Sequence, residues 1–414
     1  METMTGMYAR HIERKTCLLD GFWSFITDPE NTGETEKWFR TFPAACRSQI
    51  VPGCWNTSLG LFDYEGIAWY SRKLKTEKEN VKFRFHGVSG YCKIFLDGNL
   101  LGDHYGGFTG FDFTVTEIEP GCHTLTVMTD SAPNTADTIP LERVDWKHYG
   151  GIIRSVEVME LDPIWIDDFT TDYELSGTAA DIKFSLSVSH SGNRNKELPL
   201  KISADDTVIL ATKITVDPGE NYLEYPVTME DVQLWSPENP RLYTFKVELG
   251  RDDIIERTGF RTVEVKDSKL LVNGEPVVLK GVNRHEEHPD WGFSVPADLI
   301  KRDMDIIEHL GCNSVRGSHY PNSELFLDLC DERGIMFWEE IPMWGFPEEA
   351  LANETVLKRG LAMHEEMVLR DRHHPSIIMW GMHNEVDTRT RAGFDLTKKF
   401  TEKVRDLDSS RPLT

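Results

Sequence analysis

The stretch from residue 278 to residue 385 decides the fold of the last third of the chain. Val278–Glu286 reads VLKGVNRHE, Ser314–Pro321 reads SVRGSHYP and Ile377–Glu385 reads IIMWGMHNE. Each run combines an apolar strand with polar residues at its C-terminal end, and a helical pattern follows each run. This alternation is typical of a (β/α)8 barrel, whose active site lies at the C-terminal ends of the strands.

The barrel predicted over residues 266–414 is incomplete. Four β/α units can be counted before Thr414. We therefore expect only about the first half of a TIM barrel, with an unpaired edge along its fourth strand. We also expect the sequence to be part of a longer polypeptide.

Two helices are predicted within this half-barrel. The first follows Pro296 and ends at Gly311, where a C-cap glycine is expected, and the second stops at Gly334. Their apolar faces consist of Leu299, Ile300, Met304, Ile307 and Leu310, and of Leu325, Phe326, Leu329 and Cys330.

Two β-domains are predicted before the barrel. Residues 1–161 contain short apolar runs separated by turn signals such as Asp97-Gly98, which favours a jelly-roll sandwich. Residues 162–265 alternate apolar and polar side chains with a period of two, as in Tyr243–Leu249. That alternation, over about 100 residues, favours an immunoglobulin-like sandwich.

Charge and composition exclude several classes of function. The chain has 414 residues and a formal net charge of −24 at pH 7, which opposes binding to nucleic acid and to anionic membranes. No stretch of about 18 apolar residues and no signal peptide is recognisable, so we expect a cytoplasmic protein. The seven cysteines are scattered without a CxxC pair, which favours reduced thiols over disulfides or zinc.

Asn384 and Glu385 follow the apolar strand Ile377–Trp380. A carboxyl group at the end of a barrel strand, beside an amide, can protonate a leaving oxygen while the amide orients the substrate. The alternative is a surface Asn-Glu pair, which is common by chance. The position in the fourth β/α unit favours a catalytic role.

Several patches, taken in order, resemble glycoside hydrolase family 2. The barrel patches are GVNRHE (Gly281–Glu286), RGSHYP (Arg316–Pro321), RDRHHPSI (Arg370–Ile377) and Asn384-Glu385. The N-terminal half resembles the sugar-binding domain of that family and its junction with the second domain. Those patches are VPGCWN (Val51–Asn56), Ala68-Trp69-Tyr70, Gly106-Gly107-Phe108 and YGGIIR (Tyr149–Arg154).

The resemblance implies a role for individual residues. Glu385 matches the general acid/base of a retaining glycosidase, and Asn384 matches the neighbour that binds the sugar 2-hydroxyl. The family's nucleophile is a glutamate on the seventh strand, which no residue of this chain matches. The remaining substrate-binding candidates are His319, Arg316, His285, Asp145 (from a loop of the first domain) and Glu340.

Structural alternatives remain for several of these residues. Arg316 and Glu286 could form an ion pair that only orders the rim of the barrel, and Asp145 could lie in a solvated acidic loop. His288 and His374 are interpreted as loop or capping residues. The tryptophans Trp338, Trp344 and Trp380 could stack on a sugar or fill the core.

The resemblance leaves the sugar specificity open. The element that holds the sugar carboxylate in family 2 β-glucuronidases is absent, and so is the Glu-x-His pair that helps β-galactosidases bind magnesium, because Ile341–Gly345 reads IPMWG. We interpret the chain as part of a β-glucuronidase-like enzyme without metal or cofactor, homo-oligomeric in its full-length form. A β-galactosidase is the alternative, and a non-catalytic carbohydrate-binding protein with a vestigial barrel is a second one.

Overall fold

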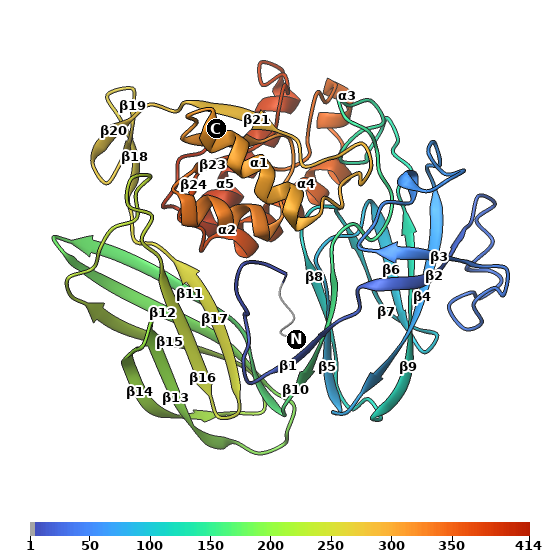
Figure 1. Ribbon diagram of the computed structural model, residues 1–414, viewed down its shortest axis with the longest axis horizontal. Helices are drawn as coiled ribbons and strands as arrows, with labels where there is room; N and C mark the ends of the chain where they lie inside the picture. Colours follow the sequence, from blue (N-terminus) through green and yellow to red (C-terminus); the bar gives the residue numbers. More distant parts are fainter. Residues whose placement is uncertain (1–4) are drawn as a thin grey trace.

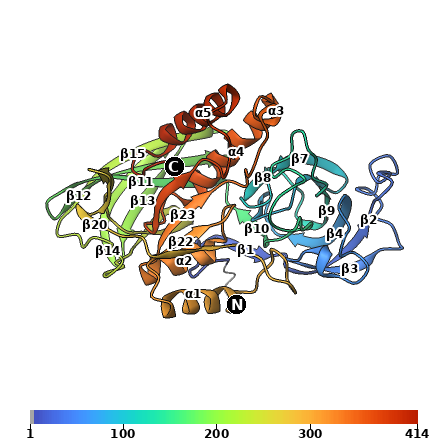
Figure 2. The ribbon, with the colours of Figure 1, turned by 90° about the horizontal axis from the view of Figure 1, so that it is seen from above.

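The computed structural model describes residues 5–414. Two β-sandwiches lie side by side and diverge from each other, and a partial barrel lies across one end of both (Figure 1). The view from above shows the barrel elements between the two sandwiches (Figure 2). This arrangement confirms the predicted architecture of jelly roll, immunoglobulin-like sandwich and partial TIM barrel.

The first sandwich consists of two antiparallel sheets. One sheet has the order β1 (Lys15–Leu18), β10 (Val156–Leu161), β5 (Asn80–Phe85), β8 (Phe111–Val115). The other has the order β3 (Arg47–Val51), β2 (Gly21–Thr27), β4 (Ile67–Thr76), β9 (Gly121–Asp130), β6 (Tyr91–Leu96), β7 (Asn99–Tyr105). Buried aromatic residues such as Trp55, Tyr70 and Phe83 fill the space between the sheets, and a short 3-10 helix covers Trp55–Thr57.

The second sandwich follows without a helix. Its sheets have the orders β11 (Ile164–Ser176), β12 (Ala179–His190), β15 (Gly219–Met229) and β14 (Thr207–Val216), β13 (Lys196–Ala204), β16 (Tyr243–Leu249), β17 (Asp252–Thr258). Every second residue of β16 is buried. The buried side chains all lie on the same face of the strand and form the core, as the period of two predicts.

A small antiparallel ribbon connects this sandwich to the barrel. Its strands are β18 (Val263–Lys266), β19 (Lys269–Val272) and β20 (Glu275–Val277). The barrel part then alternates strands and helices. It consists of β21 (Gly281–Arg284), α1 (Ala297–His309), β22 (Ser314–Gly317), α2 (Glu324–Arg333), β23 (Met336–Glu340), α3 (Glu348–Leu351), α4 (Glu354–Asp371), β24 (Ile377–Gly381) and α5 (Arg391–Leu407).

The four barrel strands form a parallel sheet in chain order. The expectation that the fourth strand has a bare edge is wrong at its C-terminal half. Leu413 forms a parallel bridge with Trp380, and the Thr414 carbonyl accepts a hydrogen bond from the Met382 amide at 2.8 Å. The residues after α5 turn back and pair with β24. The Arg411 guanidinium donates to the Ile377 carbonyl at 2.8 Å and so holds this turn against the strand.

An N-terminal strap, which we define as residues 7–14, lies between the two sandwiches and below the barrel (Figure 1). The Met7 amide donates to Asp328 Oδ2 of α2 at 2.8 Å. The Ile12 amide donates to Asp253 at 2.9 Å, and Arg14 forms a buried ion pair with Asp252 at 2.6 Å. The strap therefore contacts the barrel and the second sandwich before β1 enters the first. None of the helices in residues 5–414 combines the length and apolar character needed to cross a membrane.

Candidate active site

The C-terminal ends of β22, β23 and β24 meet at Arg316. Its guanidinium contacts Glu340 through Nη2 at 2.8 and 3.0 Å, and it donates to Asn384 Oδ1 at 2.7 Å. Glu340 is fully buried, and the indole of Trp338 lies 4.2 Å from the guanidinium carbon of Arg316. Since buried carboxylates need partners, Arg316 and Glu340 hold each other, and together they orient the Asn384 amide.

Two histidines line the same end of the sheet. His319 Nδ1 lies 2.5 Å from Glu340 Oε1, and the His285 and His319 rings are 5.4 Å apart. Burial and the nearby His319 lower the pKa of His285, although the carboxylates of Asp145 and Glu340 act in the opposite direction. His285 is therefore expected to be neutral near pH 7 and can accept as well as donate a hydrogen bond.

Glu385 lies beyond the strand end and is exposed, whereas Asn384 beside it is buried. The Asn384 backbone is fixed, because its amide donates to the Met343 carbonyl (2.8 Å) and its carbonyl accepts from Gly345 (3.0 Å). Glu385 has a φ of 52°, in the left-handed region that a residue with a side chain rarely adopts. Within residues 5–414 its carboxyl group has no hydrogen-bond or ion-pair partner, so it remains free to transfer a proton.

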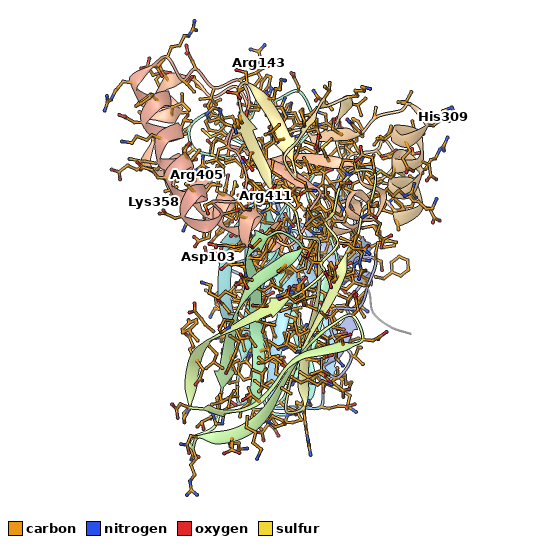
Figure 3. All side chains as sticks on the ribbon, turned by 90° about the vertical axis from the view of Figure 1, so that its left-hand side faces the viewer. Asp103, Arg143, His309, Lys358, Arg405 and Arg411 are labelled. Atoms are coloured by element: carbon orange, nitrogen blue, oxygen red, sulfur yellow. The ribbon has the colours of Figure 1, made fainter. Side chains whose placement is uncertain are left out.

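Asp145 comes from a loop of the first sandwich, which we call the 131–149 loop. Asp145 itself is exposed, and its charge acts on His285. The next residue, Trp146, is buried with its ring 5.7 Å from His285 and 5.9 Å from His319. Arg143 of this loop lies at the opposite end of the molecule from the second sandwich (Figure 3). The loop therefore brings Asp145 beside the strand ends.

The loop is held in place by helix α4. Arg359 donates to the Asp137 carbonyl at 2.6 Å and pairs with its carboxylate at 3.3 Å. Asn353, the N-cap of α4, donates to the Ala136 carbonyl at 3.3 Å. Residues separated by more than 200 positions in the sequence thus fix where Asp145 and Trp146 lie.

The alternative in which Arg316 pairs with Glu286 does not hold. Arg316 binds Glu340, as described above, whereas Glu286 lies among Arg154 (3.3 Å), Arg284 (3.2 Å) and the Ser323 amide (3.0 Å). Burial alone would raise the pKa of Glu286, but Arg154 and Arg284 outweigh it and hold the pKa below its usual value. Arg154 lies just before β10 of the first sandwich, so Glu286 orders the contact between two domains.

The remaining histidines and tryptophans have structural contacts. His374 Nδ1 lies 2.5 Å from Asp331, and the His288 ring accepts a hydrogen bond from the Asp290 amide at 3.1 Å. Trp380 is fully buried and donates to Asp408 at 2.8 Å.

Asp328, Asp331 and His374 lie close enough together to be considered as metal ligands. Asp331 already binds His374 and accepts from the Ser376 amide, however, and Asp328 accepts from the Met7 amide. We therefore assign this cluster to the joint between the strap and α2.

Sequence reasoning gave no role to Tyr320 and left open whether Trp338 stacks on a sugar or fills the core. The Tyr320 hydroxyl lies 3.5 Å from His285 Nδ1, and its ring stacks on Phe108 of the first sandwich at 4.2 Å. The Trp338 ring packs against the Arg316 guanidinium. Tyr320 follows His319 shortly after the end of β22, so its position beside a candidate residue was an available signal.

Comparisons with known proteins give one consistent result. Three family models match successive parts of the chain. They are described as the sugar binding domain of glycosyl hydrolases family 2 (residues 17–162), glycosyl hydrolases family 2 (164–261) and the TIM barrel domain of that family (263–414).

Individual relatives carry related names. A β-galactosidase of Thermoanaerobacter pseudethanolicus is 33% identical over 84% of this chain and 48% of its own length. A β-glucuronidase of Paenibacillus borealis is 26% identical over 96% of this chain and 72% of its own.

Solved structures of the same family superpose closely. A β-galacturonidase from Eisenbergiella tayi, bound to galacturonate, has a TM-score of 0.89 and is 31% identical, covering 99% of this chain and 72% of its own. A β-glucuronidase from Ruminococcus gnavus has a TM-score of 0.86 at 26% identity, over 100% and 74% of the two chains. The chain spans about half the length of the β-galactosidases that it matches and part of the TIM barrel domain.

Proposed function

Because the chain belongs to glycoside hydrolase family 2, we propose that the protein is a retaining exo-β-glycosidase with Glu385 as its general acid/base. The observation that carries this proposal is the free, exposed carboxyl group of Glu385 beside an Asn384 amide fixed by Arg316 at 2.7 Å. A proton donor needs access to the leaving oxygen, and a sugar-binding group needs a fixed position.

In this mechanism Glu385 gives its proton to the glycosidic oxygen as the bond to the aglycone breaks. It then takes a proton from the water that attacks the glycosyl-enzyme. Asn384 binds the sugar hydroxyl next to the reacting carbon. His285, His319 and Asp145 line the pocket around the sugar, while Arg316 and Glu340 position Asn384 and His319. The attacking carboxylate comes from the second half of the barrel.

For the sugar, we propose a β-glucuronide-like substrate. The support is that solved relatives at TM-scores of 0.85–0.89 are named β-glucuronidases or β-galacturonidases. The alternative is a β-galactoside, which the name of the 33% identical relative favours.

The test is an assay of the whole protein against aryl β-D-glucuronide, β-D-galacturonide and β-D-galactoside. We expect turnover of a uronide with retention of the anomeric configuration. Preference for the galactoside would select the alternative substrate. Binding of all three without turnover would support a carbohydrate-binding protein and contradict the proposed enzyme.

We further propose a cytoplasmic, homo-oligomeric enzyme. The support for the location is that all seven cysteines are free thiols, three of them buried. Fractionation of the producing cell tests the location. Light scattering of the whole protein tests the assembly, and a monomer at working concentration would contradict it.

A further inference from the structure

A cavity of about 310 Å³ lies beneath the 131–149 loop, separate from the catalytic residues. Its walls come from the ends of β6, β7 and β9 in the first sandwich, from the loop itself, and from Arg359 of α4. None of the site residues Glu385, Asn384, Arg316, His319, Glu340 or His285 lines it. Its size lies at the lower end of the range of about 300–1,000 Å³ found for small-molecule sites.

Polar groups in this cavity lack partners. Ser131 Oγ is buried and has no hydrogen-bond partner within residues 5–414. The Tyr149 hydroxyl likewise has no partner among the described residues, although the Tyr149 ring is held against Phe293 at 5.0 Å. Among the residues that the structure describes, the Asp130 side chain uses only Oδ1, which accepts the Ala132 amide at 3.0 Å. Since buried polar groups are normally hydrogen-bonded, the unpaired Ser131 Oγ is a group that a ligand could satisfy. The Tyr149 hydroxyl and Asp130 Oδ2 can bind further hydroxyl groups of the same ligand.

The other lining groups select an uncharged ligand with an apolar face. The aromatic rings of Phe108, Trp146 and Tyr149 border the cavity and offer surfaces for C–H groups. Its arginine, Arg359, is not free, because it pairs with Asp137 and lies 3.9 Å from the Tyr105 ring. The unpaired charge is therefore that of the Asp130 carboxylate, which repels an anion.

We propose that this cavity is an accessory carbohydrate site that takes one neutral sugar ring. Ser131, Tyr149 and Asp130 bind its hydroxyl groups, and the aromatic wall packs on its C–H face. Trp146 borders the cavity and also lies within 6 Å of both site histidines. A sugar in the cavity thus packs against the residue next to Asp145 and stabilises the loop that carries it.

The experiment is a titration of the 414-residue chain with D-galactose, followed by calorimetry and by ligand-observed NMR. Cyclohexanol and D-galacturonate serve as the apolar and the anionic comparison. We expect galactose to bind with a dissociation constant in the millimolar range and both comparison compounds to bind more weakly. Stronger binding of either comparison compound that Ser131→Leu abolishes would overturn the proposed ligand class.

Three variants locate the binding. Ser131→Leu fills the cavity and should abolish binding. Tyr149→Phe keeps the ring and removes the hydroxyl, so it should weaken binding about fivefold, whereas Tyr222→Phe on an exposed strand should not. Glu385→Gln should leave binding unchanged. If Glu385→Gln abolishes binding while Ser131→Leu keeps it, the sugar occupies the catalytic site and the proposal fails. If no binding to the folded chain is seen, the proposal fails too, whatever the outcome of the glycosidase assay.

Discussion

Among single residues, Glu385 gives the most direct test of chemistry. In the whole protein, Glu385→Gln should slow glycosides with poor leaving groups far more than activated aryl glycosides, because activated leaving groups need little proton donation. The measurement is kcat/KM over a series of aryl leaving groups. Asp387→Asn is the matched control, since Asp387 is exposed in the same loop and only pairs with Arg389. Equal loss over the whole series would contradict the acid/base role.

A substitution of Glu340 tests how much its buried ion pair with Arg316 contributes to stability. Replacing Glu340 with Gln leaves the Arg316 guanidinium without its fully buried counter-charge. We expect the free energy of unfolding to fall by about 3 kcal/mol, measured by urea denaturation. Glu348→Gln, on the exposed first turn of α3, should change it little. Equal stability of the two variants would show that the buried pair provides no net stabilisation.

The sequence located the strand-end residues but not their partners. Asn384 could be found because it follows an apolar run, and the family resemblance added Arg316, His319 and Glu340. The sequence left Glu286 open as a partner of Arg316 and did not point to Glu340, because pairing across strands depends on which side of the sheet each side chain faces. Glu286 pairs with Arg154, which is more than 130 positions away in another domain. No pattern in a single sequence reveals such a contact.

The glycines that follow helices α1 and α2 provide a matched pair of variants. Gly334 and Gly311 both have positive φ, at 69° and 75°, so alanine costs about 1 kcal/mol at either position. A Cβ at Gly334 would lie 2.2 Å from the Pro237 carbonyl oxygen, whereas a Cβ at Gly311 meets nothing within 4 Å. Gly334→Ala should therefore lower the free energy of unfolding clearly more than Gly311→Ala. Equal losses in thermal or urea denaturation would show that the turn around Pro237 yields freely.

The contact between the first sandwich and α2 should depend on pH. Burial lowers the pKa of His86, but Glu157 of β10 and Glu324 of α2 outweigh it and raise the pKa to about 9. Stabilisation by protonated His86 is complete below its ordinary pKa near 6.5 and is lost as the pH rises through about 9. The midpoint of thermal unfolding should fall between about pH 7 and pH 10.

The variant His86→Gln isolates this contribution. His374 beside Asp331 titrates in the same range, with a pKa raised to about 9 against burial, so part of the pH dependence should remain. His309→Gln, at the exposed end of α1, should behave like the unchanged chain. If His86→Gln keeps the full pH dependence, the contact between β10 and α2 is not its source.

The two predicted barrel helices were placed better than the residues just beyond the helices. Both barrel helices end near the glycines that mark them, and Ile300, Met304 and Ile307 are buried as expected. Leu310 is exposed instead, because the helix ends before its side chain reaches the core. The pairing of Leu413 with Trp380 was missed because three residues after a turn carry no strand signal.

For the whole molecule, we expect that the 414-residue chain alone does not hydrolyse glycosides. The resemblance assigns the nucleophile to a seventh strand, and loss of a covalent nucleophile costs many orders of magnitude in rate. The measurement is an aryl β-glucuronide and β-galactoside assay of the purified chain, with the whole protein as the reference. Turnover at ordinary enzyme rates would place a nucleophile within these residues and contradict the proposed mechanism.

The N-terminal strap has a consequence for the time course of folding. Met7 of the strap lies 321 positions before its partner Asp328 in the sequence. Contacts of such sequence separation form late, because a long loop must close before they contribute. The strap therefore lacks its partners until both sandwiches and α2 have been synthesised. Its amide protons should be the last of the strap–β1 segment to gain protection in pulsed hydrogen exchange, so the strap reports on the completion of the fold.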